Sequence, residues 1–74
     1  MTLEEVRKAV HTAPFQPFTM YLADGTSLMV PHPDFIALPR EGRTVALYAE
    51  NEHAHSILDL LLVTRLEAKE PAET

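Results

Sequence analysis

The sequence predicts a mainly β protein with one N-terminal helix and five short antiparallel strands, strongly bent into a small barrel. Three observations support this fold class: a helix-capping pattern at residues 2–5, apolar side chains that alternate along several short segments, and an Asp24-Gly25 turn between the first two segments. Asp-Gly between alternating segments is a strong hairpin signal, because Gly tolerates the positive φ of a tight turn. A single domain is therefore expected over residues 1–68. Residues 69–74 are charged, rich in alanine and contain a proline, which predicts a disordered tail.

The helix is expected to begin after Thr2. The Thr2 hydroxyl can accept from the Glu5 amide while the Glu5 carboxylate reaches back to the Thr2 amide, which is the capping-box pattern. Apolar residues then recur at helical spacing and form one stripe, at Leu3, Val6, Ala9 and Val10. Pro14 and Pro17 end the helix, because each disfavours helical geometry in the residue before it.

The five expected strands follow from the alternating apolar residues. They span residues 18–23, 28–38, 45–49, 53–58 and 63–67. Pro31-His32-Pro33 interrupts the second strand, because proline cannot donate to a sheet ladder, and this predicts an edge or a bend. The longest apolar run, Leu60–Val63, is expected to be part of a core strand. Asp59 interrupts the apolar residues and is interpreted as the cap of a tight turn between strands four and five, in preference to a functional carboxylate.

Composition excludes several classes of protein. Eleven acidic and six basic side chains give a net charge of −5, which disfavours general binding to a phosphate backbone. The absence of cysteine excludes disulfides and thiolate metal sites. No apolar run approaches the length of a membrane span and no secretory leader is visible, so a cytoplasmic protein without a membrane partner is expected. A chain of 74 residues forms only a marginal core, which favours self-association.

Histidines are the candidates for site chemistry. His32 and Asp34 could act as an acid-base pair, but we prefer a structural interpretation in which Asp34 accepts backbone amides in a tight turn. His53 and His55 alternate by two residues and therefore share one face of a strand, a spacing that could hold a metal ion with Glu50 or His32 nearby. We prefer the interpretation that these histidines are ordinary polar-face residues. No nucleophilic triad or phosphate-binding loop is present, so neither an enzyme nor a cofactor is expected.

The order of one helix and about five bent strands resembles the Sm-like barrel, an SH3-like fold found in the Sm, Lsm and Hfq proteins. The resemblance depends on the strand and turn Tyr21-Leu22-Ala23-Asp24-Gly25, an apolar Leu28 three positions later, and Asp34-Phe35 further along. The second motif of the family contains Arg-Gly, or Lys-His in the bacterial branch, and the stretch Leu58–Arg65 has neither. The chain also resembles a set of short bacterial proteins without assigned function, which share Pro-Phe-x-Pro-Phe, His-Pro-Asp-Phe and Asp-Leu-Leu-Leu-Val-Thr.

The resemblance implies a ring in which the fourth strand of one subunit pairs with the fifth strand of the next. Our leading hypothesis is a non-catalytic homo-oligomeric binding or scaffold module whose partner is itself or another protein. The alternative is an RNA-binding ring in post-transcriptional regulation, with Tyr21 and Tyr48 as stacking platforms and Arg40 and Arg43 as basic contacts. Two arginines in a turn are also typical of a solvated hairpin tip. A third hypothesis is a metal- or small-ligand-binding protein that uses His32, His53 and His55.

Overall fold

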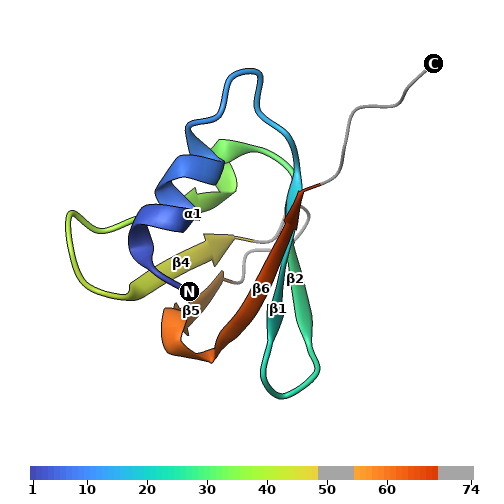
Figure 1. The fold of residues 1–74 in the computed structure, drawn as a ribbon, viewed down its shortest axis with the longest axis vertical. Helices are drawn as coiled ribbons and strands as arrows, with labels where there is room; N and C mark the ends of the chain where they lie inside the picture. The colour runs from blue at the N-terminus through green and yellow to red at the C-terminus, as the bar shows by residue number, and fades with distance from the viewer. Residues whose placement is uncertain (49–54, 69–74) are drawn as a thin grey trace.

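The computed structural model describes residues 1–48 and 55–68, and this part of the chain folds into one α-helix and two three-stranded antiparallel sheets (Figure 1). The first sheet has the strand order β2-β1-β6, and the second has the order β3-β4-β5. Two single-turn 3-10 helices, η1 and η2, connect the sheets. The elements are α1 (Leu3–Val10), β1 (Phe18–Leu22), β2 (Ser27–Val30), η1 (Pro33–Phe35), β3 (Ile36–Ala37), β4 (Thr44–Tyr48), β5 (His55–Asp59), η2 (Leu60–Leu62) and β6 (Val63–Ala68).

Helix α1 begins at the predicted capping box. The Thr2 hydroxyl accepts from the Glu5 amide at 3.2 Å, and the Glu5 carboxylate accepts from the Thr2 amide at 2.9 Å. The hydrogen bond from the Thr2 backbone is the main reason why the pKa of Glu5 lies below its ordinary value. The helix ends at Val10, before the first of the two prolines that were expected to end it. Eight residues are marginal as an isolated helix, so burial of Val6 in the core is needed to hold α1 in place.

The β1–β2 hairpin has the Asp-Gly turn that the sequence predicts. The Leu22 amide donates to the Thr26 carbonyl at 2.9 Å and the Gly25 amide donates to the Leu22 carbonyl at 3.0 Å. Gly25 has φ +93°, a conformation that L side chains rarely adopt. Asp24 accepts from the hydroxyl and the amide of Thr26, at 2.7 and 3.0 Å, and these bonds lower the pKa of its carboxyl group. The turn is thus closed both by its backbone and by its own side chains.

The prediction of five strands is corrected to six in residues 1–48 and 55–68, and these strands belong to two antiparallel sheets. The expected second strand is divided, because Pro31 and Pro33 have no amide proton and cannot continue a ladder. The chain instead forms η1, in which the Phe35 amide donates to the His32 carbonyl at 3.1 Å. Only Ile36 and Ala37 then pair with β4, as the two-residue strand β3. The expected first residues of strand four, 53 and 54, lie outside the described residues, as does the expected tail over 69–74.

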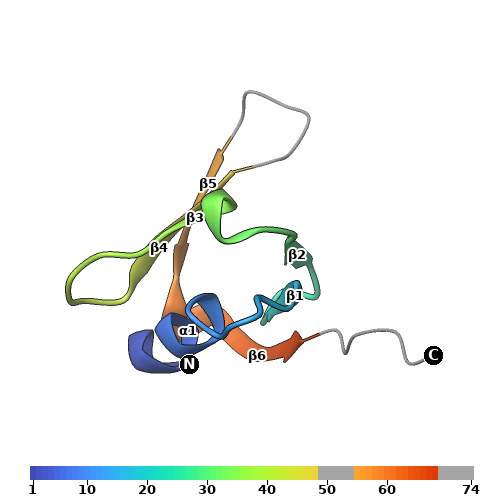
Figure 2. The ribbon, with the colours of Figure 1, turned by 90° about the horizontal axis from the view of Figure 1, so that it is seen from above.

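The two sheets and the helix share one hydrophobic core. Figure 2 shows the sheets at a steep angle to each other, with α1 at the corner between them. Nine buried side chains form the core, and none of the polar residues in the described part of the chain is buried. The core residues are Val6, Phe18, Met20, Val30, Ile36, Val45, Leu47, Leu60 and Val63. Within the described residues, no helix has both the length and the apolar character that a membrane crossing requires.

Substitution of two methionines in the first sheet tests which face of that sheet belongs to the core. Met20 on β1 is completely buried, whereas Met29 on β2 is 56% exposed on the opposite face of the same sheet. We expect Met20→Ala to lower the free energy of unfolding by about 2–5 kcal/mol, because it removes buried methylenes and leaves a cavity. Met29→Ala is expected to change that free energy by less than about 0.5 kcal/mol. Urea denaturation followed by circular dichroism measures both, and an equal loss in the two variants would contradict the assignment of the core face.

Candidate functional site

Asp59 organises the corner at which the chain passes from β5 into η2. Its carboxylate accepts from the Leu61 amide at 3.0 Å and forms an ion pair with the Arg43 Nε atom, also at 3.0 Å. The Leu60 amide donates to the Arg43 carbonyl at 2.7 Å, which ties the corner to the loop before β4. The Leu61 amide is the first cause that lowers the pKa of Asp59, and Arg43 adds to it. The predicted role of Asp59 as a turn cap is confirmed.

The same corner exposes large apolar side chains. Leu60 is buried in the core, but Leu61 is 67% exposed and Leu62 is 56% exposed. The prediction that the whole run Leu60–Val63 is core strand is therefore wrong for these two leucines. The physical reason is that a 3-10 helix has three residues per turn, so three consecutive side chains point in three directions. Ile57 of the neighbouring strand β5 is also 61% exposed. We call Ile57, Leu61 and Leu62 the apolar corner.

Both strands that meet at the apolar corner have an open edge. Within residues 1–48 and 55–68, β5 is paired only with β4, and β6 is paired only with β1. The Leu60 amide donates to the Arg43 carbonyl, so the backbone groups of Leu60 face β4. Along an antiparallel strand, the amide and carbonyl of one residue point to one side of the strand and those of the next residue point to the other side. The amide and carbonyl of Ile57 therefore point toward the open edge. The β2 and β3 edges differ from these, because Pro31 and Pro33 lie between them and β3 has only two residues.

The four residues predicted to contact RNA are placed in separate surroundings. The Arg65 guanidinium lies 4.1 Å from the centroid of the Tyr21 ring, and the Tyr21 hydroxyl donates to Glu67 at 3.1 Å. Tyr48 belongs to the other sheet, and its ring centroid lies 5.7 Å from that of His55. Arg43 is paired with Asp59, as described above, whereas Arg40 lines a pocket beside α1. Tyr21 and Tyr48 thus belong to different sheets, and each already has a neighbouring side chain against its ring.

The histidines are likewise apart in the described residues. His32 precedes η1, and its ring packs edge-on against Phe35 with the centroids 5.8 Å apart. His55 packs against Tyr48, and His53 lies outside the described residues. Residues 1–48 and 55–68 contain no group of three or more His, Asp or Glu that could hold a metal ion. A metal site that includes His53 stays an alternative hypothesis.

Asp34 does not have the role that the sequence suggested for it. It lies in the middle of η1, where the turn is closed by the backbone bond between Phe35 and His32. In the described part of the chain no amide donates to its carboxylate, and the side chain is exposed. The tight turn is confirmed, but it depends on the two prolines and the backbone.

The chain was compared with models of protein families, with curated proteins and with solved structures, and no match was found. Support for a function therefore comes from the geometry described above. The feature that sequence reasoning missed is the apolar corner. The signal for it was present, since Asp59 as a cap before three leucines predicts a turn, and a turn cannot bury three consecutive side chains.

Asp59→Asn tests the electrostatic part of the corner. Asparagine keeps an oxygen for the Leu61 amide but loses the charge that faces Arg43, so we expect a lower free energy of unfolding at pH 7. The folded-state pKa of Asp59 is lowered from 3.8, so its contribution is present above pH 3.8 and is lost as the pH falls through the folded-state value. The difference between wild type and variant should therefore shrink as the pH falls below 3.8.

Urea titrations at several pH values measure this difference. Asp34→Asn is the matched control, because its carboxylate lacks an amide donor among the described residues. A difference between wild type and Asp59→Asn that stayed constant down to about pH 2 would show that geometry, and not charge, accounts for the effect.

Proposed function

We propose that this chain is a non-catalytic homo-oligomeric scaffold module, assembled by pairing the β5 edge of one copy with the β6 edge of the next. The observations that carry the proposal are two open strand edges and exposed apolar side chains on β5 and on η2, the turn that joins β5 to β6. An open edge presents unpaired backbone groups, and an added strand satisfies them. Exposed apolar side chains beside that edge add a hydrophobic contribution to the same contact.

A second copy of the chain is the occupant that these edges favour. Each copy carries one edge of five residues on β5 and one of six on β6, so the two edges are similar in length. The two edges are different surfaces, and contacts between different surfaces run head to tail and close into a ring when the rotation permits. This is the assembly that the resemblance to Sm-like proteins implies. We accordingly propose that the two sheets form an Sm-like barrel.

The apolar corner supports a protein partner over a nucleic acid. Burial of a large aliphatic side chain in an interface contributes about 1.5–3 kcal/mol, so Ile57, Leu61 and Leu62 together form a substantial contact. Ile57 shares the outer face of the second sheet with Ala46, its direct neighbour on β4. RNA binding is disfavoured, because the net charge is −5 and Arg43 is already paired with Asp59. RNA binding is therefore kept as an outcome of the experiment.

Light scattering of the purified protein over a range of micromolar concentrations tests the assembly. We expect a mass of several chains for the wild type. Ile57→Lys should shift the population toward the monomer, because a lysine on an edge strand opposes pairing. Met29→Lys is the matched control, since Met29 is similarly exposed but lies on β2, away from the apolar corner.

Three outcomes would overturn the proposal or change the partner. A monomer at every concentration would exclude the assembly, and an equal effect of the two lysine variants would exclude the β5 edge as its site. Circular dichroism shows whether each variant is folded, and Leu61→Lys is a second variant at the same corner. An oligomer whose mass rises on addition of a short A-rich or U-rich RNA would favour the RNA-binding ring instead.

A further inference from the structure

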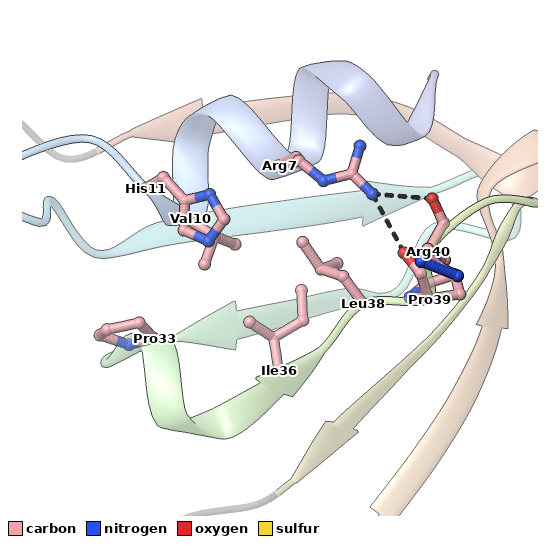
Figure 3. A pocket seen from close by; sticks show the side chains of 8 residues that line it. All are labelled: Arg7, Val10, His11, Pro33, Ile36, Leu38, Pro39 and Arg40. Carbon is pink, nitrogen blue, oxygen red and sulfur yellow. Dashed lines mark hydrogen bonds between the residues drawn. The ribbon is translucent and has the colours of Figure 1, made fainter.

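A pocket of about 530 Å³ lies between α1 and the segment that runs from η1 to Arg40 (Figure 3). Its volume is within the range of small-molecule sites. The helix supplies one wall, and residues 33–40 supply the other. None of these elements belongs to the open edges of β5 and β6, so the pocket is independent of the proposed assembly.

The lining combines an apolar part with a cationic part. Val10, Ile36 and Leu38 supply aliphatic side chains, and two prolines adjoin them. Arg7, His11 and Arg40 supply the polar groups, and no aspartate or glutamate lines the pocket. A lining without acidic side chains is unusual for a chain with eleven acidic and six basic residues. The lining therefore places two guanidinium groups, those of Arg7 and Arg40, beside an apolar surface.

Arg7 holds the two walls together. Its guanidinium donates to the carbonyls of Pro39 at 3.0 Å and Arg40 at 3.1 Å, shown as dashed lines in Figure 3. It also pairs with Glu4 at 2.9 Å, and its side chain is 29% exposed. Through these contacts Arg7 holds residues 33–40 at a fixed distance from α1. The pocket therefore exists before any ligand enters.

Arg40 is the cation that is left for a ligand. Its side chain is exposed, and it forms no ion pair with any other residue in the described part of the chain. Guanidinium groups bind carboxylates and phosphates through two parallel hydrogen bonds. His11 lies at the end of α1 and lines the opposite end of the pocket from Arg40 (Figure 3).

We propose that this pocket binds a small organic anion that has an apolar body. The anionic group contacts Arg40, and the apolar body packs on Val10, Ile36 and Leu38. Carboxylate and phosphate share the chemistry that Arg40 recognises, and the choice between them is left to the experiment.

The experiment is a nuclear magnetic resonance titration of the full chain with probes that share one tail. Octanoate and octyl phosphate carry the anionic group, octanol is neutral, and acetate and inorganic phosphate lack the tail. All are used below micelle-forming concentrations. We expect the two tailed anions to shift the amide signals of Val10, His11, Ile36 and Leu38, with Ser27 and Met29 unaffected. Acetate should bind about tenfold more weakly than octanoate or worse, because it buries no tail.

Arg40→Gln is the decisive variant, and Arg43→Gln is its matched control. Both arginines lie between β3 and β4, but Arg43 is paired with Asp59 and does not line the pocket. Arg40→Gln should weaken octanoate binding about threefold to fivefold and leave octanol unchanged, since a partly exposed charge pair has a modest effect. Arg43→Gln should leave both probes unchanged.

Three other results would overturn the proposal. Equal binding of octanol and octanoate, with no effect of Arg40→Gln, would indicate an apolar pocket without anion recognition. Binding of acetate as strong as that of octanoate would indicate a surface anion site without an apolar part. Absence of amide shifts at the four lining residues with both tailed anions would exclude the pocket as a binding site. Stronger binding of octyl phosphate than octanoate would assign the anion as a phosphate monoester, and the reverse would assign a carboxylate.

Discussion

The chain passes between its two sheets at two short turns, and the rest of the structure depends on these turns. At η1, prolines at positions 31 and 33 stop the ladder of β2 and redirect the chain into the second sheet. At η2, the Asp59 carboxylate accepts from the Leu61 amide and holds Arg43. The side chains that point inward from both sheets then meet in one cluster with Val6 of the helix. A chain of 74 residues has too little apolar surface for two separate cores, so the sheets must share one.

The two turns also determine which surfaces are left open. Beside η1, the prolines and the two-residue strand β3 leave little regular edge for another strand to pair with. That same segment continues to Pro39 and Arg40, where Arg7 ties it to the helix and a pocket is left between them. Beside η2, the adjoining strands have five and six residues, and two leucines face outward. The apolar corner and the pocket therefore arise from one requirement, which is that a short chain turns sharply in two places.

Sequence reasoning succeeded where a pattern acts on its own neighbours. The Thr2–Glu5 cap, the Asp24-Gly25 turn and the cap at Asp59 each depend on atoms a few residues apart, and all three are present. Prediction failed where one sequence pattern is compatible with more than one structure. Pro31 and Pro33 indicate a bend, but only the structure shows that the strand divides into two strands in different sheets. An apolar run of three leucines fits a core strand equally well as a turn with two exposed side chains.

The sequence by itself determined the helix, the hairpin and the inward rows of the strands, because backbone conformation and side-chain alternation are local properties. The tertiary structure alone decided which distant residues meet: Arg7 with the carbonyls of Pro39 and Arg40, Arg43 with Asp59, and Arg65 with Tyr21. These contacts depend on the angle at which the chain leaves each turn and on the competition of many apolar side chains for a small core. Neither quantity can be obtained from the spacing of residues along the chain, and for that reason the pocket became visible only in the folded molecule.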